Sequence, residues 1–201
     1  AVITDDPRVY EKCHQYADHG HDHLGGPDRG ADDHPILGCN YRISELNAAV
    51  GLAQLRKLDQ ILATQRRNKQ ILKDAMADLP GISFRYLPDP FGDSATFLSF
   101  MLPTEEKARQ AGANLAENNV PCPYWYANNW HYYRQWHHLK KMAAAAPMAV
   151  QLCGNLPDYQ HLELPESDAI MQRTLSMQIM LSWSDQDLEQ RIAAIKKSLT
   201  A

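Results

Sequence analysis

The sequence has little of what marks several protein classes. Its four cysteines show neither a C-x-x-C spacing nor a dense framework, which argues against a zinc site or a disulfide scaffold built from them. No apolar run approaches the roughly 20 residues that a membrane-spanning helix needs, and no charged segment followed by an apolar one opens the chain. We therefore expect no membrane partner, reduced thiols and a cytoplasmic location.

The chain also lacks a concentration of charge of one sign. Its 20 Lys and Arg residues are scattered among 24 Asp and Glu residues, and the net charge is −4. A protein that follows a phosphate backbone needs a basic stripe, so we expect no nucleic-acid partner. With 201 residues, 44% of them hydrophobic, the chain is long enough to bury a core of its own.

The most informative stretch is Gly-Cys-Asn-Tyr-Arg-Ile-Ser-Glu-Leu at residues 38–46. Ser44 can cap a helix and Glu45 suits its first turn, so a helix should begin here. Asn40 and Arg42 alternate with apolar residues, and an extended backbone would point both side chains the same way. That arrangement suits an anion, although such residues can also satisfy nearby loop carbonyls.

A segment rich in histidine and aspartate occupies residues 18–35, with four His and five Asp. These side chains can coordinate a divalent metal. However, His19, His21 and His23 would share a face only in a strand, whereas the glycines and proline around them predict an irregular loop. A metal-binding protein remains the weaker hypothesis, and we predict a loop without a metal site.

From Ser44 to Leu79 the apolar residues keep helical spacing until Pro80-Gly81. A single helix of that extent would reach roughly 50 Å at about 1.5 Å per residue, longer than a small domain. We predict a break in the polar run 64–69, where Arg66 and Arg67 should be solvated or paired on an exposed helix face and Lys69 should be solvated.

The remainder alternates strands and helices. Apolar alternation, caps and turn residues predict the elements, and the two prolines near residue 122 favour an edge strand there. The predicted strands cover 82–87, 96–102, 120–126 and 175–181, and the predicted helices cover 105–119, 165–174 and 185–199.

Residues 128–138 concentrate aromatic and polar side chains, including Trp130, His131 and Arg134. Core packing is one explanation, because aromatic residues dominate interior contacts. A sugar site is the other, since sugar C–H faces stack on rings and sugar hydroxyls need hydrogen-bonding partners. The sequence alone leaves both open.

Residues 38–59 resemble the signature G-x-N-Y-R-[MI]-S-E-L-x-A-A-x-G-x-x-Q-L-x-x-L of the DegT/DnrJ/EryC1/StrS aminotransferases, which are sugar aminotransferases that use pyridoxal phosphate (PLP). His19-Gly20 matches a further family motif, and His131 matches the histidine of a family loop. Trp130 stands where that loop usually has Leu or Ile, and Gln178 replaces a proline. The resemblance is strong to Asp59 and looser beyond it.

The resemblance implies an α/β fold that corresponds to the C-terminal part of a fold-type-I PLP aminotransferase. Residues 1–63 would be a remnant of the large PLP-binding domain, and residues 64–201 the small C-terminal α/β domain. The lysine that holds PLP covalently would lie upstream of Ala1, so we expect no catalytic residue in this chain and no activity from it alone.

The resemblance also implies roles for particular residues. Asn40 would bind the PLP phosphate of the neighbouring subunit in a homodimer with shared active sites, and Arg42 would bind a carboxylate of glutamate or of an acidic sugar. The other substrate-binding candidates are His19, Trp130, His131 and Arg134.

The substrates implied are glutamate and a keto-sugar. Within the family, the two unusual loops look most like the aminotransferases that make 8-amino-3,8-dideoxy-manno-octulosonate for lipopolysaccharide. A nucleotide-linked keto-sugar is an alternative acceptor. A non-catalytic fragment or binding module is a hypothesis of a different class.

Overall fold

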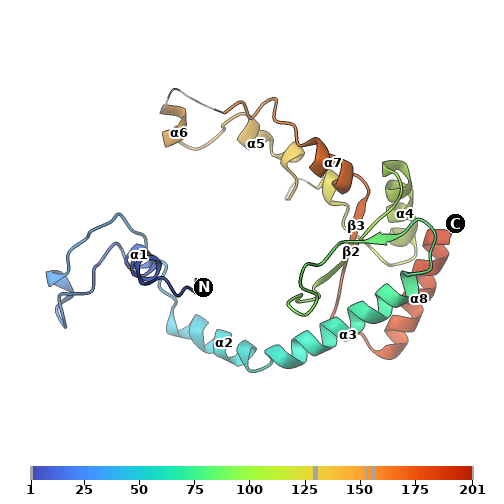
Figure 1. Ribbon diagram of the computed structural model, residues 1–201, viewed down its shortest axis with the longest axis horizontal. Helices are drawn as coiled ribbons and strands as arrows, with labels where there is room; N and C mark the ends of the chain where they lie inside the picture. The colour runs from blue at the N-terminus through green and yellow to red at the C-terminus, as the bar shows by residue number, and fades with distance from the viewer. Residues whose placement is uncertain (1, 129–130, 153, 155–156, 201) are drawn as a thin grey trace. The chain divides into compact units, whose positions relative to one another are not determined.

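The computed structural model describes residues 2–128, 131–152, 154 and 157–200, and it divides into two compact units, Ala1–Leu58 and Asp59–Ala201. Figure 1 labels the elements of both. The division falls at the start of helix α3 (Leu58–Met76), whereas the sequence placed a boundary after residue 63. That the first unit is part of a large PLP-binding domain stays a prediction.

The first unit contains two helices whose starts follow from their caps. An oxygen of Asp6 accepts the backbone N–H of Arg8 at 2.9 Å, and Ser44 Oγ accepts that of Asn47 at 3.2 Å. Both positions satisfy donors that a helix leaves free at its start. The elements are α1 (Pro7–Ala17), the 3₁₀ helix η1 (Arg29–Ala31) and α2 (Glu45–Leu55).

The backbone of residues 16–19 lies beside that of residues 39–41. Cys39 N–H donates to the carbonyl of Tyr16 at 2.8 Å, and His19 N–H donates to the carbonyl of Cys39 at 2.9 Å. Asp18 and Asn40 form an antiparallel β-bridge between them. The two sequence motifs that were singled out separately are therefore in direct contact.

Two glycines make this approach possible. A Cβ at Gly38 would lie 2.4 Å from the backbone nitrogen of Gly20, and a Cβ at Gly20 would lie 2.0 Å from the carbonyl oxygen of Ile36. Gly20 also has a φ of +91°, which other residues adopt only with strain. The motif glycines are thus required by backbone contact.

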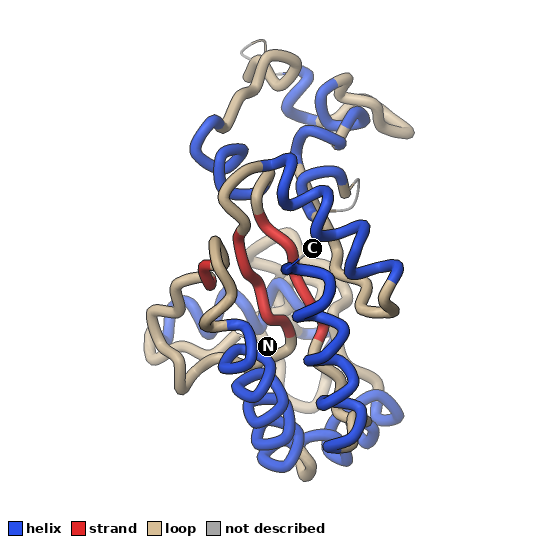
Figure 2. Tube along the Cα trace, turned by 90° about the vertical axis from the view of Figure 1, so that its right-hand side faces the viewer, coloured by secondary structure: helices blue, strands red, loops and turns tan. Residues whose placement is uncertain are grey.

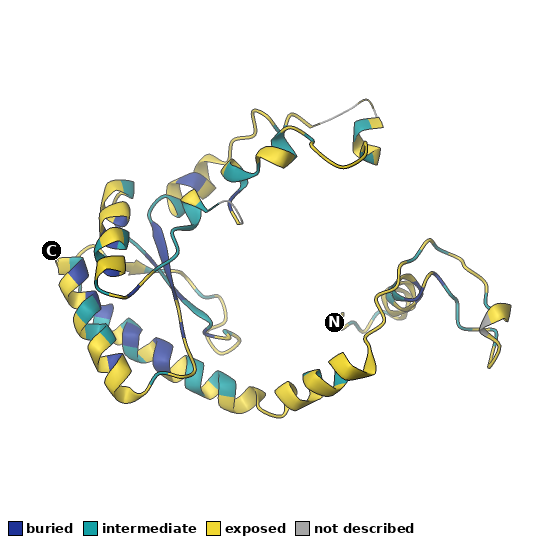
Figure 3. Ribbon diagram, turned by 180° about the vertical axis from the view of Figure 1, so that it is seen from behind, coloured by how far each residue is buried: buried dark blue, intermediate teal, exposed yellow. Residues whose placement is uncertain are grey.

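Helix α2 is apolar over most of its surface, yet none of its residues is buried. Leu46 is 76% exposed and Leu55 is 64% exposed. Figure 3 shows the helix as an almost uninterrupted exposed stretch. A helix that is hydrophobic on all sides is normally covered by other protein, so this surface is suited to a contact.

The predicted break in the long helical segment occurs at a different place. Helix α2 ends at Leu55 and α3 begins at Leu58, so the break lies at Arg56 and Lys57, and α3 continues without interruption through 64–69. The prediction was wrong because the polar run has partners elsewhere in the second unit that hold it in the helix.

Those partners belong mainly to the loop before strand β2 (Phe97–Met101). Arg66 donates to the carbonyls of Phe91 and Asp93 at 2.5 and 2.9 Å, and Lys69 Nζ lies 2.5 Å from Asp93 Oδ2. Lys69 is only 8% exposed, which corrects the expectation that it is solvated. Burial acts to raise the pKa of Asp93, but Lys69 outweighs it and the pKa lies below the usual value.

The second unit is built on a three-stranded antiparallel sheet in the order β1-β2-β3. Figure 2 shows the strands side by side. Phe84 pairs with Phe100, and Ser99 pairs with Ser176. The strands are β1 (Ser83–Phe84), β2 (Phe97–Met101) and β3 (Thr174–Gln178), each within a predicted strand region or one residue of it.

One face of this sheet forms the core. Side chains alternate between the two faces of a strand, so every second residue of β2 and β3 points toward α3, α4 (Glu105–Glu117) and α8 (Asp185–Thr200). Thr104 and Ser184 cap the starts of the latter two helices, where their hydroxyls accept the backbone N–H groups of Lys107 and Asp187. The buried residues are Leu72, Met76, Leu98, Phe100, Leu102, Ala108, Ala111, Leu115, Val120, Leu175, Met177, Ile179, Leu188 and Ile195.

The predicted edge strand at 120–126 does not form. Pro121 and Pro123 have no N–H to donate, and a single hydrogen bond, from Ser176 N–H to the carbonyl of Pro123 at 3.1 Å, joins the segment to β3. Short helices follow instead: η2 (Trp125–Ala127), η3 (Tyr133–Gln135), α5 (His137–Lys140), α6 (Ala149–Leu152) and α7 (Pro165–Met171).

Asp168 of α7 binds residues 132–134 of the aromatic segment and so connects that segment to α7. Its carboxylate accepts hydrogen bonds from the hydroxyls of Tyr132 and Tyr133 and from Arg134, whose Nε lies 2.8 Å from Oδ1 and whose Nη2 lies 2.5 Å from Oδ2. Arg134 holds the pKa of Asp168 well below its usual range, against the opposing effect of burial. Burial and the bond to Asp168 raise the pKa of Tyr132.

Replacing Gly38 by Ala should open the contact between the two motifs of the first unit. Because the added Cβ meets backbone that cannot move aside independently, we expect a cost of at least about 1 to 3 kcal/mol. Hydrogen exchange at the Cys39 and Tyr41 amides, which donate to Tyr16 and Ala17, measures the local opening directly.

Gly51→Ala is the control, because its Cβ would have no neighbour within 4 Å and lies within α2, where Ala is favoured by roughly 1 kcal/mol. Unchanged protection of the Cys39 and Tyr41 amides in Gly38→Ala would contradict the packing argument.

Replacing Asp168 by Asn should remove a pH-dependent part of the stability. At neutral pH we expect a loss of about 1.5 to 3 kcal/mol, the usual range for hydrogen bonds to a charged group. Since the folded-state pKa of Asp168 is lowered, its stabilisation is complete above the unfolded pKa and disappears as pH falls from about 5 toward the folded pKa.

Urea unfolding of wild type and Asp168→Asn at pH 7, 5, 4 and 3 checks this, because the difference in stability between the two proteins should narrow progressively below about pH 5. Asp78→Asn alters an exposed carboxylate and is the control. Its stability and the pH dependence of that stability should match those of wild type. A constant difference between wild type and Asp168→Asn at all pH values would show that shape, rather than charge, is responsible.

Candidate functional site

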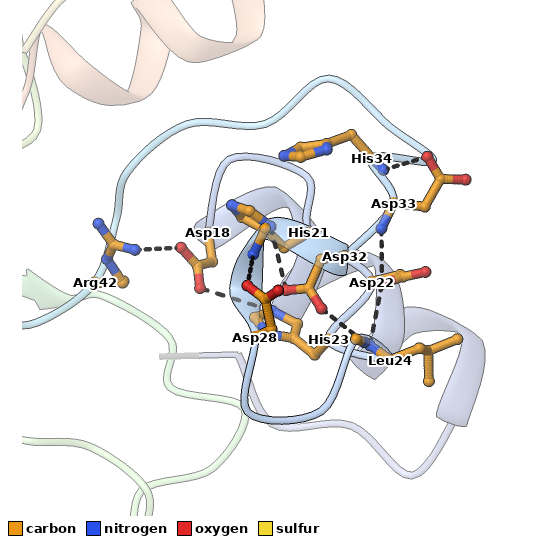
Figure 4. Close-up of polar contacts among 12 residues, drawn as sticks. Asp18, His21, Asp22, His23, Leu24, Asp28, Asp32, Asp33, His34 and Arg42 are labelled. Atoms are coloured by element: carbon orange, nitrogen blue, oxygen red, sulfur yellow. Dashed lines mark hydrogen bonds and ion pairs between the residues drawn. The ribbon is translucent and has the colours of Figure 1, made fainter.

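The first candidate site lies in the unit formed by residues 1–58 and contains three of the predicted residues. His19 and Asn40 come together through the paired backbone of residues 16–19 and 39–41. Arg42 reaches back so that its Nη1 lies 2.5 Å from Asp18 Oδ1 (Figure 4). Asp18 is 6% exposed, so a nearly buried carboxylate fixes the position of this arginine.

Arg42 was predicted to bind a carboxylate, and in this structure it binds one belonging to its own chain. Its side chain is still 47% exposed, and Nε and Nη2 are not used by Asp18. A guanidinium has five N–H donors, so a second anion can be bound while the contact with Asp18 persists. Its role toward substrate stays a prediction.

Asn40 occupies the end of the bridge and is exposed. Its Oδ1 accepts the backbone N–H of Arg42 at 3.3 Å, which orients the amide. Its Nδ2 has no hydrogen bond to another described residue, so a donor is presented outward beside an arginine. This donor set fits one edge of an anionic group such as the phosphate of PLP.

The histidine-rich loop packs on the same unit. His21 Nδ1 lies 3.3 Å from Asp32 Oδ2, and His23 Nε2 lies 3.8 Å from Asp18 Oδ2 (Figure 4). His23 also stacks on His14 with ring centroids 4.0 Å apart. Within the described ranges, no set of three or more His, Cys, Asp or Glu side chains is arranged to hold a metal ion.

The second candidate site lies in the unit formed by residues 59–201. The ring of His131 packs edge-on against Trp125, with centroids 5.1 Å apart, and its backbone N–H donates to Asn128 Oδ1 at 3.2 Å. Trp130, the other predicted residue of this loop, lies outside the described residues. A substrate role for both stays a prediction.

Arg134 was predicted to contact substrate, but its guanidinium is committed to Asp168 by two hydrogen bonds. It also lies over the rings of Tyr126 and Tyr133, with centroid distances of 5.9 and 5.8 Å. The carboxylate raises the pKa of Arg134, so its charge is secure. These contacts are those of a residue that shapes the loop, and any substrate contact would use its remaining N–H groups.

Nothing in the sequence pattern singles out the two aspartates that position these arginines. In the sequence, Asp18 is one of five aspartates in residues 18–35, and Asp168 lies near the start of the predicted helix at 165–174. Each lies far along the chain from its arginine, at separations of 24 and 34 residues. An acidic residue next to His19-Gly20 was the one local signal for Asp18.

Among the described residues, no helix is both long enough and apolar enough to span a lipid bilayer.

Comparison with known proteins agrees with the signature at residues 38–59. The model of the DegT/DnrJ/EryC1/StrS aminotransferase family matches residues 1–196. The chain is 28% identical over 176 residues to the erythromycin biosynthesis sensory transduction protein EryC1 of Saccharopolyspora erythraea, a match that covers 85% of this chain and 45% of that protein.

Solved structures share the fold. The aminotransferase from Psychrobacter cryohalolentis superposes with a TM-score of 0.73 at 18% identity, covering 98% of this chain and 50% of that one. Helicobacter pylori PseC, an aminotransferase involved in pseudoaminic acid biosynthesis, gives 0.71 at 15% identity, covering 98% and 48%.

The chain therefore spans about half the length of the relatives it matches. Its fold is that of the corresponding part of fold-type-I PLP aminotransferases, as the sequence predicted. On the match across residues 1–196, this chain belongs to the DegT/DnrJ/EryC1/StrS aminotransferase family.

Proposed function

We propose that this chain is the C-terminal portion of a PLP-dependent sugar aminotransferase that transfers an amino group from glutamate to a keto-sugar. The observation that carries the proposal is the contact between the His19-Gly20 motif and the Gly38–Arg42 motif, within a chain that matches the family over residues 1–196. This contact presents the Asn40 amide and the Arg42 guanidinium together as donors to an anion.

When bound, PLP supplies the electron sink for transamination. In this proposal Asn40 binds its phosphate, and Arg42, held by Asp18, binds a substrate carboxylate. The site is shared between two subunits of a homodimer. The exposed apolar surface of α2, which directly follows Arg42 and Ser44, supports burial of this region against further protein.

We propose 8-oxo-3,8-dideoxy-manno-octulosonate, a precursor for lipopolysaccharide, as the acceptor. Trp125 packs on His131 and the ring of Tyr126 packs on Tyr132, so this loop supplies ring surfaces, which the C–H faces of a sugar require. A nucleotide-linked keto-sugar is the second candidate. Both candidates are keto-sugars that would receive an amino group in the same reaction. The two hypotheses therefore differ only in the acceptor.

The acceptor assignment is tested by an activity assay on the intact protein with PLP and glutamate. We expect turnover of the keto-octulosonate and little turnover of nucleotide-linked keto-sugars, because the loop should accept one ring and one carboxylate rather than a diphosphate. Turnover of nucleotide-linked sugars alone would refute the octulosonate assignment. Absence of any glutamate-dependent turnover would favour a non-catalytic binding module.

Replacing Asn40 by Ala should weaken PLP retention in the intact enzyme. The loss of one hydrogen bond to a charged phosphate corresponds to about 1.5 to 3 kcal/mol, and Asn40→Asp should cost more because it replaces a donor by a negative charge. Equilibrium dialysis of PLP measures the effect. Asn47→Ala, an exposed position of α2, is the control and should retain PLP normally.

Mixed dimers test the proposed sharing between subunits. One subunit carries Asn40→Ala, and the other lacks the lysine that holds PLP. If Asn40 binds the PLP of the neighbouring subunit, the subunit that carries Asn40→Ala should retain its own PLP, because its lysine and the neighbour's Asn40 are both intact. Loss of PLP from the site in the same subunit as Asn40→Ala would refute the cross-subunit contact.

A further inference from the structure

The face of the sheet that does not form the core carries a pocket of about 500 Å³. The residues of β2 and β3 that alternate with the core residues point into it, because successive side chains of a strand lie on opposite faces. Segments from outside the sheet complete the lining, notably Trp125 of η2, Met171 at the end of α7 and Arg85 just after β1. Its size is that of a pocket for one small molecule.

The lining combines hydroxyl groups with an aromatic wall. Ser99 Oγ and Ser176 Oγ lie 2.9 Å apart on the floor of the pocket, and each hydroxyl retains capacity for a further hydrogen bond. Trp125 provides a broad ring on one side and Met171 an apolar surface. An apolar ring surface beside hydroxyl partners matches a sugar, which has C–H faces and hydroxyl groups.

Arg85 supplies a cation at the rim. Its side chain is 59% exposed, and its Nη2 lies 4.0 Å from Asp93 Oδ1, at the outer limit of an ion pair. The other oxygen of Asp93 is bound by Lys69 at 2.5 Å, so this carboxylate is already neutralised. Arg42 and Arg134, in contrast, each lie 2.5 Å from a nearly buried aspartate oxygen.

We propose that this pocket binds an acidic sugar, with the carboxylate on Arg85 and the sugar ring against Trp125. Trp125 also packs on His131 and so joins the pocket to the loop that the sequence marked as the substrate side. The proposal rests on the proposed aminotransferase function and deepens it, because it names the pocket that binds the carboxylate of the acceptor.

Calorimetric titration of the intact protein tests the pocket without relying on turnover. The probes are 3-deoxy-manno-octulosonate and its methyl ester, which differ only in the charge that Arg85 would recognise. We expect the acid to bind at least about 10-fold more tightly than the ester, as a charge-assisted hydrogen bond predicts.

Three variants separate the contributions. Arg85→Ala should abolish the preference for the acid, and Arg85→Lys should restore part of it, because a lysine keeps the charge but not the planar fork. Trp125→Ala should weaken acid and ester alike. Arg109→Ala, on α4 and paired with Glu105, should bind both probes as wild type does.

Equal binding of acid and ester, absence of binding of both, or an unchanged acid affinity in Arg85→Ala would each overturn the proposal. Glutamate-dependent amination of PLP, measured on the same preparations, keeps the two proposals distinct. Amination without acid binding refutes the pocket alone, whereas acid binding without amination refutes the aminotransferase function and leaves the pocket standing.

Discussion

The alternation of side chains along β2 and β3 is the constraint on which the larger unit depends. Leu98, Phe100, Leu175 and Met177 are at most 2% exposed and hold the sheet against three helices. Because the period of a strand is two, a register shift by one residue would turn these residues outward and bring Ser99 and its neighbours into the core. The same register that makes the core therefore also makes the pocket on the other face.

Much of this architecture could be predicted from local sequence, and the reason is visible in the caps. Ser44, Thr104 and Ser184 each accept a backbone N–H three residues ahead, so the signal and its effect lie within one turn. The strand regions could be found for a similar reason, since alternation is readable along the strand itself. The exact ends of the strands could not be predicted, because they depend on hydrogen bonding to the neighbouring strands.

The sequence-based predictions were wrong where the position of a residue is set by a partner that is distant in the sequence. The run 64–69 looks exposed in sequence, but Lys69 is buried on Asp93, 24 positions away. Asn68 donates to the carbonyl of Met180, 112 positions away. At the candidate sites, Arg42 and Arg134 were recognised as important cations, but their aspartate partners could be identified only from the folded chain. Arg85 had no local signal at all.

The connection between β2 and β3 has a consequence for how the chain folds. These strands are neighbours in the sheet, yet everything from α4 through α7 lies between them in sequence. Their pairing closes a long loop, and the entropy of closure must be met before the core contacts form, so this step should be slow. Because β3 and α8 are synthesised last, part of the apolar face of β2 stays uncovered until they emerge, and exposed apolar surface of this kind favours aggregation.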